Sequence, residues 1–190
     1  GWAMTAGFVL LGLACLMLFA ALRGQAATLP ARIGRCLLLA GALGGIVAGV
    51  FPTDPWNATE LSATGMAHSA APMLLNGVPI ASIILGVSLA RRSAGWRTHR
   101  RLLIAGSVLV VGAAVALSAS MAAMMPAGGG LGPDVTVGWQ ARVLLLAEAI
   151  WVAVAAGCAL AVRRGSAPDT VPIGTTGTAV TSYELSGTAR

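Results

Sequence analysis

The sequence predicts an all-α protein, a polytopic transmembrane helix bundle with five helices in this chain. Of its 190 residues, 57% are hydrophobic and only 9% are charged, against about a quarter charged in an ordinary soluble domain. Five nearly uncharged runs are each about 20 residues long, the length that a helix needs to cross a bilayer core of about 30 Å. Because the arginines lie between these runs, a soluble enzyme and a nucleic-acid-binding domain are both excluded.

The five predicted helices follow from the positions of these runs. They cover residues 2–22, 33–51, 67–90, 102–125 and 142–162. No basic residue precedes the first run, so it does not resemble a signal peptide. In the third run, Pro79 lacks a backbone donor and clashes with the carbonyl of Leu75, which predicts a kink. Residues 163–190 are rich in Ser, Thr, Gly and Pro, and we expect them to form a disordered tail.

The arginines predict the orientation of the chain in the membrane. Eleven of the twelve lie in connections that an alternating five-helix path puts on one side. The other side keeps only Arg142, with Asp54, Glu60 and Asp134. By the positive-inside rule the arginine-rich side and the tail are cytoplasmic. The amino-acid composition, which lacks lysine and is rich in Ala and Gly, is typical of bacteria, so the expected membrane is a bacterial plasma membrane. Gly1 then starts outside, so we expect a preceding helix and six helices in the full protein.

Two of the predicted helices carry small residues at every fourth position, a spacing that lets helices approach closely in lipid. One such ridge lies on the second helix and the other on the fifth. The first consists of Gly41, Gly45 and Gly49, and the second of Ala149, Ala153 and Gly157. We expect both to pack within the bundle, and a helix-mediated oligomer is the alternative.

Polar groups at membrane depth are costly and mark candidate functional positions. Glu148 is the only carboxylate inside a predicted span and lies about 9 Å inward from Arg142 by helical rise. Asn76 lies about 12 Å below His68 by the same rise. Since both pairs start from the outer side, we expect an outward-facing polar pocket formed by Asp54, His68, Asn76, Arg142 and Glu148.

The second connection, residues 51–60, is the most patterned stretch of the chain. Asp54 followed by Pro55 is typical of a helix start and predicts a short interfacial helix, and Trp56 suits the headgroup layer. Asp54, Glu60 and His68 are also possible acid/base groups or weak metal ligands. The candidates are therefore Asp54, His68 and Glu148 for catalysis, and Asn76, Arg142, Trp56 and Glu60 for substrate binding.

No cofactor is expected, because the chain contains no zinc-protease, nucleophile-elbow or phosphate-loop motif. His68 and His99 lie on opposite sides of the membrane and cannot ligate one haem. The three cysteines lie on the cytoplasmic side of their helices and form no C-x-x-C pair. We therefore expect them to be small, reduced packing residues. The expected surroundings are the lipid bilayer, and no nucleic acid partner is expected.

The segment Phe51-Pro52-Thr53-Asp54-Pro55, with a histidine fourteen residues after the aspartate and Trp96 in the next basic loop, resembles a known family. It is similar to the bacterial and archaeal integral membrane proteins grouped as domain of unknown function 998, over about residues 2–162. The resemblance implies a six-helix protein and no particular activity. It implies that Asp54 and His68 are the positions to examine.

Three functions are compatible with these features of the sequence. A small-solute or proton-coupled transporter would use Glu148 and the break at Asn76–Pro79. A membrane-embedded enzyme acting on lipid would use Asp54 and His68. A structural or partner-binding subunit would need only the two small-residue ridges.

Overall fold

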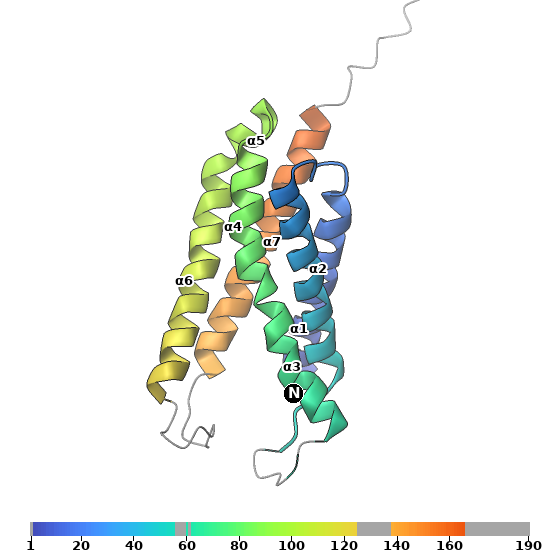
Figure 1. The fold of residues 1–190 in the computed structure, drawn as a ribbon, viewed down its shortest axis with the longest axis vertical. Helices are drawn as coiled ribbons and strands as arrows, with labels where there is room; N and C mark the ends of the chain where they lie inside the picture. Colours follow the sequence, from blue (N-terminus) through green and yellow to red (C-terminus); the bar gives the residue numbers. More distant parts are fainter. Residues whose placement is uncertain (1, 56–59, 61, 125–137, 166–190) are drawn as a thin grey trace, which may run out of the picture.

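The computed structural model describes residues 2–55, 60, 62–124 and 138–165. Within these ranges every regular element is an α-helix, and five helical segments are long and apolar enough to cross a membrane, which confirms the predicted fold class (Figure 1). The elements are α1 (Trp2–Ala21), α2 (Leu29–Val50), α3 (Ala63–Leu75), α4 (Gly77–Ala90), α5 (Ala94–Thr98), α6 (Arg100–Met124) and α7 (Gly138–Gly165).

Three spans begin four residues earlier than predicted, at Leu29, Ala63 and Gly138. At α2, Thr28 is the N-cap, its hydroxyl accepts a hydrogen bond from the backbone N–H of Ala31, and a proline occupies the first turn. Such a cap satisfies an orphan donor and starts the helix before its apolar run begins. Helix α7 begins at Gly138 and continues to Gly165. Residues 166–190 of the predicted tail lie outside the described residues.

The third span is interrupted near its middle, as Pro79 predicts. Asn76 separates α3 from α4, and its backbone N–H donates to the carbonyl of Pro72. Pro79 lies in the first turn of α4, where a missing N–H costs least. The basic loop that follows contains the short helix α5, which the sequence did not predict. Ser93 caps this helix, and Trp96 within it is buried.

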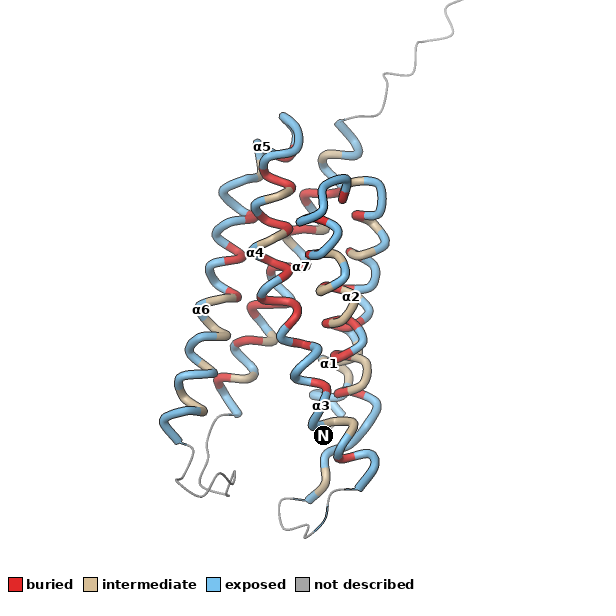
Figure 2. The backbone as a smooth tube through the Cα atoms, in the orientation of Figure 1, coloured by how far each residue is buried: buried red, intermediate tan, exposed pale blue. Residues whose placement is uncertain are grey.

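The long helices form a closed series of neighbours. Helix α1 packs on α2, α2 packs on α3 and α4, α4 packs on α6, and α6 packs on α7. The remaining neighbours, α1 and α7, come from opposite ends of the chain and pack less closely than α1 and α2. Figure 2 shows the buried residues as a strip along the inner sides of the helices. Leu38, Leu85 and Leu103 lie in this core.

The glycine ridge of α2 lies inside the bundle. A Cβ atom at Gly45 would meet the carbonyl oxygen of Phe8 at 3.0 Å and the Cα of Gly12 at 3.1 Å. At Gly49 it would meet the carbonyl oxygen of Thr5 at 3.0 Å, and at Gly41 the side chain of Val78. The missing side chains therefore let α1 and α4 approach α2 closely, as expected for small residues at this spacing.

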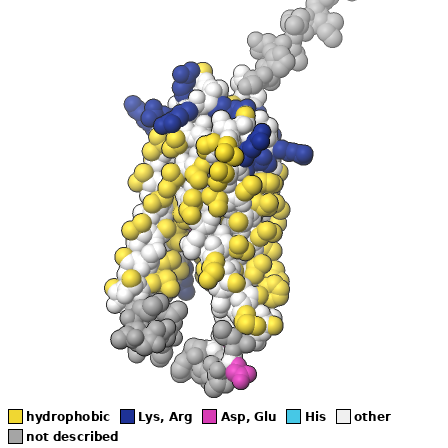
Figure 3. Space-filling model, in the orientation of Figure 1, with side chains coloured by type: hydrophobic (Ala, Val, Ile, Leu, Met, Phe, Trp, Pro, Cys, Tyr) yellow, Lys and Arg dark blue, Asp and Glu magenta, His cyan; other side chains and the backbone are white. Residues whose placement is uncertain are grey.

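Charges separate between the two ends of the bundle (Figure 3). The arginines of the α1–α2 connection and the first turns of α2, those around α5 and those at the end of α7 gather at one end, which we call the arginine end. The connection with Asp54 and Glu60 lies at the other end, which we call the acidic end. Apolar side chains cover the surface between them in this view, as expected for helices that face lipid.

Candidate functional site

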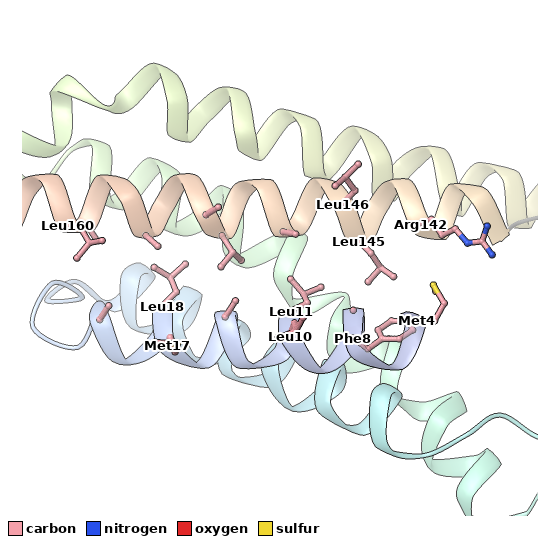
Figure 4. Close-up of a pocket in the computed structure, with 18 of the residues that line it drawn as sticks. Met4, Phe8, Leu10, Leu11, Met17, Leu18, Arg142, Leu145, Leu146 and Leu160 are labelled. Atoms are coloured by element: carbon pink, nitrogen blue, oxygen red, sulfur yellow. The ribbon is translucent and has the colours of Figure 1, made fainter. Parts of the chain in front are cut away.

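The largest described cavity is an apolar groove between α1 and α7, with a volume of about 710 Å³. Figure 4 shows side chains from the two helices facing one another across it, including Leu11 and Leu18 of α1 and Leu145 and Leu160 of α7. Because α1 and α7 pack loosely, their facing sides leave a groove rather than a sealed interface. We call this cavity the α1–α7 groove.

Small residues of α7 line this groove. Ala149 and Ala153 belong to the second predicted ridge, and both line the groove and are exposed. Gly157 is also exposed, and a Cβ atom there would meet nothing within 4 Å. The prediction that this ridge packs within the bundle is therefore wrong for the described part of the chain. The physical reason is that α7 faces the core with another side than the one that carries the ridge. That core-facing side carries Leu144, Glu148 and Trp151.

An arginine lines each end of the α1–α7 groove. Arg142 lies toward the acidic end (Figure 4), and Arg163 lies in the last turn of α7, at the arginine end. These residues are separated by about 30 Å along the helix, from the rise per residue. That distance matches the hydrocarbon thickness of a bilayer. The groove therefore extends along the whole apolar part of the bundle and ends in a positive charge on either side.

A second, more polar cavity of about 450 Å³ lies at the arginine end. Arg163 lines this cavity as well as the α1–α7 groove, so the two adjoin at its side chain. The other lining residues come from the α1–α2 connection, from α5 with its flanks, and from α7. They are Gly24, Gln25, Arg92, Ser93, Trp96 and Val162. We call this cavity the arginine pocket.

Hydrogen bonds between distant segments hold the arginine pocket together. The indole N–H of Trp96, a residue that is 1% exposed, donates to the side-chain oxygen of Gln25 at 2.6 Å. Arg92 donates to the backbone carbonyls of Gly24 and Gln25. Arg163 donates to the carbonyl of Ala21 at 2.5 Å. The guanidinium group of Arg92 is thus positioned on the connection between α1 and α2, and that of Arg163 on the last residue of α1.

Glu148 lies on the inner face of α7 and is 1% exposed. One of its carboxylate oxygens has no hydrogen-bond partner, and neither does the indole N–H of Trp151 or the amide oxygen of Gln140 on the same helix. Cys15 of α1 is close enough to interact with Glu148 electrostatically. Glu148 does not line the α1–α7 groove, although its neighbours Leu145 and Ala149 do.

Asp54 organises the start of α3. Its carboxylate accepts hydrogen bonds from the backbone N–H of Ser62 at 2.8 Å and from the Ser62 hydroxyl at 2.6 Å. Ser62 in turn caps α3 by accepting from the backbone N–H of Gly65. The carboxylate occupies the space that a side chain at position 65 would fill. Pro55, the expected first residue of a short interfacial helix, is not helical, and residues 56–59 of that predicted helix lie outside the described residues.

His68 ties the same connection to α3. Its Nδ1 donates to the backbone carbonyl of Phe51 at 2.8 Å, since a carbonyl oxygen only accepts. Its ring also meets Phe8 of α1 edge-on, with the ring centres 6.4 Å apart. Asp54 and His68, the two positions that the family resemblance highlighted, therefore hold the 51–55 segment against the helices through bonds to their own chain.

The remaining candidates lie apart from these. Asn76 is exposed at the break between α3 and α4, Arg142 is exposed at the groove, and Glu60 is exposed in the α2–α3 connection. Trp56 lies outside the described residues. Among the described cavities, the largest is lined by Arg142 but not by Asp54, His68, Asn76 or Glu148. Within the part of the chain that the structure describes, no three His, Cys, Asp or Glu side chains gather as metal ligands do.

The residues of the arginine pocket were not candidates at the sequence level. Arg163 was interpreted only as a marker of topology, and Gln25 carried no signal of its own. The basic run of residues 91–101, which contains Arg92, was interpreted first as a topology anchor and second as a binder of anionic headgroups. Trp96 did carry a signal, because a large aromatic residue among arginines in a connection is costly to expose unless it packs. Its burial in α5 shows that this connection is folded.

Comparisons with known proteins support the sequence-level resemblance. No curated protein and no solved structure matches the chain. The family model described as "Protein of unknown function (DUF998)" matches residues 1–158. This match covers the bundle up to the last turns of α7, including the Asp54–His68 connection and the part of the α1–α7 groove that ends before Ala159. The chain therefore belongs to the DUF998 family of proteins of unknown function.

Proposed function

We propose that this protein is a multi-pass protein of the bacterial plasma membrane that binds a membrane lipid in the α1–α7 groove. The observation that carries the proposal is the groove itself, which is apolar along its length and lined by an arginine at each end. A ligand that matches it is long, apolar and negatively charged or polar at one end. Membrane lipids have this chemistry and surround such a groove at high concentration.

The shape of the groove favours an acyl chain. Ala149, Ala153 and Ala156 leave space along α7, while the exposed Leu10 and Met17 offer apolar contacts from α1. In lipid, contact with the groove is stabilised by dispersion and close fit rather than by the hydrophobic effect. A flexible chain fills such an irregular surface well, and the arginines fix its polar end.

The alternatives receive less support from the positions of their residues. The transporter interpretation relied on Glu148 and Asn76 sharing a pocket, but Asn76 is exposed and Glu148 is buried. The enzyme interpretation relied on Asp54 and His68, whose polar atoms bond to Ser62 and to the Phe51 carbonyl. A helix of a second copy could also dock on the small residues of α7, and the test below separates that case.

The orientation belongs to the same proposal. Of the eleven described arginines, ten lie at the arginine end and one, Arg142, lies toward the acidic end. By the positive-inside rule the arginine end faces the cytoplasm, which places the end of α7 and the residues after it on that side.

The test is the lipid retained by the purified protein, counted by native mass spectrometry. We expect wild-type protein to retain lipid at a fixed ratio. Ala153→Leu fills the groove and is expected to reduce retention at least severalfold, since Ala153 lines it. Ala161→Leu makes the same change at an exposed position of α7 outside the groove lining and is expected to retain lipid as wild type does.

Two outcomes would contradict the proposal. One is equal lipid retention by wild type, Ala153→Leu and Ala161→Leu, which would mean that lipid binds without the groove. The other is a wild-type dimer that Ala153→Leu converts to a monomer, which would identify a second copy as the occupant.

A further inference from the structure

We infer that the bound lipid is an anionic phospholipid from the leaflet at the arginine end, with its phosphate held between Arg92 and Arg163 in the arginine pocket. This inference rests on the proposed function and names the headgroup that the groove selects. The acyl chain would extend from Arg163 into the α1–α7 groove.

The first argument is continuity between the two cavities. Arg163 lines both the apolar groove and the polar pocket. A phospholipid has the same division, because its acyl chains join a charged phosphate through glycerol. The adjoining cavities therefore match both parts of one molecule, and neither cavity alone matches the whole of it.

The second argument is the charge balance at the arginine end. Ten of the described arginines lie there, whereas the described acids are Asp54 and Glu60 at the acidic end and Glu148 within α7. No described carboxylate is therefore available to neutralise Arg92 or Arg163. Basic residues beside a membrane attract anionic headgroups, so a lipid phosphate supplies a counter-charge that the described carboxylates do not.

The third argument is the number of N–H donors that the two guanidinium groups still have for a ligand. Arg92 bonds to the carbonyls of Gly24 and Gln25, and Arg163 bonds to the carbonyl of Ala21. These bonds fix the side chains but occupy only some of the five N–H donors that each guanidinium carries. The remaining donors can bind phosphate oxygens in the paired geometry that arginine favours.

The opposite end of the groove lacks these features. Arg142 is the arginine that lines the groove there, and the acids Asp54 and Glu60 belong to the same end of the bundle. A negatively charged headgroup there would be attracted by Arg142 and repelled by the two acids. The arginine end is therefore the end that selects an anion.

The chain offers matched control variants for the test, because each pocket arginine has an arginine neighbour outside the pocket lining. All four are exposed, but only Arg163 and Arg92 line the pocket, whereas Arg164 and Arg91 do not. The delipidated full chain is titrated with phosphatidylglycerol or with phosphatidylcholine of identical acyl chains, and binding is followed by native mass spectrometry. We expect wild type to prefer phosphatidylglycerol. Arg163→Gln and Arg92→Gln should each weaken its binding about fivefold, while Arg164→Gln and Arg91→Gln leave it unchanged.

Two additions keep the test decisive. If a glutamine variant does not fold, the comparison uses Arg163→Lys and Arg164→Lys, where only the former should lose part of the preference because lysine lacks the paired donors. Inorganic phosphate at millimolar concentration is added as a competitor. We expect it to displace little phosphatidylglycerol, since it has no chain to occupy the groove.

The outcomes separate the two proposals. If the two lipids bind equally and Ala153→Leu still reduces their binding, the inference of an anionic headgroup is overturned, while the proposal that lipid binds in the groove stands. Binding insensitive to Ala153→Leu would overturn the proposed function. Equal losses in Arg163→Gln and Arg164→Gln would show diffuse surface charge instead of a pocket, and full displacement by inorganic phosphate would show a site for free anions.

Discussion

Two ridges of small residues with the same spacing have different surroundings in this protein. On α2, Gly41, Gly45 and Gly49 are buried against α1 and α4. On α7, Ala149, Ala153 and Gly157 are exposed, and the two alanines line the α1–α7 groove. Small residues four apart therefore mark a surface that can be approached closely, but they do not determine which partner approaches.

The connections between helices explain the difference. A short connection joins α1 to α2, so these helices form a hairpin whose facing surfaces pack along their length. Helix α7 reaches α1 only at the end of the chain, after packing its other face on α6. The inner face of α7 is buried in the bundle, and its alanine ridge lies on the exposed side that lines the groove.

The largest predicted effect comes from placing a large side chain on the buried ridge. Gly45→Leu would force α1 and α2 apart, because even a Cβ atom there lies 3.0 Å from a backbone carbonyl oxygen of α1. We expect a destabilisation of about 3 kcal/mol or more, seen as a lower Tm or as aggregation in size-exclusion chromatography. Gly157→Leu is the matched control on α7. A comparable loss in both variants would show that the two ridges are equally buried.

The inner and outer faces of α7 give the second comparison. Glu148 is buried on the inner face, so Glu148→Ala leaves a cavity and is expected to cost about 2 kcal/mol. Glu148→Gln keeps the volume and is expected to cost less than about 1 kcal/mol. Both are measured as changes in Tm with lipid retention as a second readout. Loss of lipid retention in the well-folded Glu148→Gln variant would contradict the separation of Glu148 from the groove.

The connection at the acidic end gives a smaller effect. Asp54→Ala removes the acceptor of two hydrogen bonds from Ser62 and is expected to destabilise the start of α3 by about 1 kcal/mol. Faster hydrogen exchange at residues 62–66 measures this loss. Lipid retention should stay unchanged, and a selective loss of retention would instead give Asp54 a direct part in binding.

The smallest effect is expected on the exposed ridge. Gly157→Ala adds a methyl group where nothing lies within 4 Å and removes a flexible residue from a helix, so it should raise stability by about 0.5 kcal/mol. The same change at Gly45 should lower it, because the added Cβ would meet α1 backbone. The signs of the two shifts in Tm are the measurement, and equal signs would contradict the account.

The fold could be predicted from the sequence because lipid imposes simple requirements. A membrane span needs a long apolar run, and it must be helical so that its backbone hydrogen bonds are all made within the segment. The apolar run can be recognised in the sequence, and the helix follows from it. The break at Asn76 followed from the chemistry of Pro79. The start of α2 was missed because the hydroxyl of Thr28 decides it, and α5 was missed because its stability comes from burying Trp96 against distant segments.

The candidate site could be predicted less well, because it depends on which helix faces meet. Glu148 was recognised as buried and costly, but depth along the helix could not show that Asn76 is exposed. Asp54 and His68 were recognised by their pattern, while their bonds to Ser62 and to the Phe51 carbonyl require coordinates. The α1–α7 groove joins residues from both ends of the chain, so no local pattern contained it.

Photo-crosslinking tests the central claim most directly. A phosphatidylglycerol with a photoreactive group in its acyl chain is incorporated into vesicles with the protein, and the labelled residues are mapped by mass spectrometry. The account predicts labels concentrated on the exposed lining of the groove, at Leu10, Met17, Ala153 and Leu160. Labels spread equally over exposed residues outside it, such as Ile80 and Val108, would contradict the account.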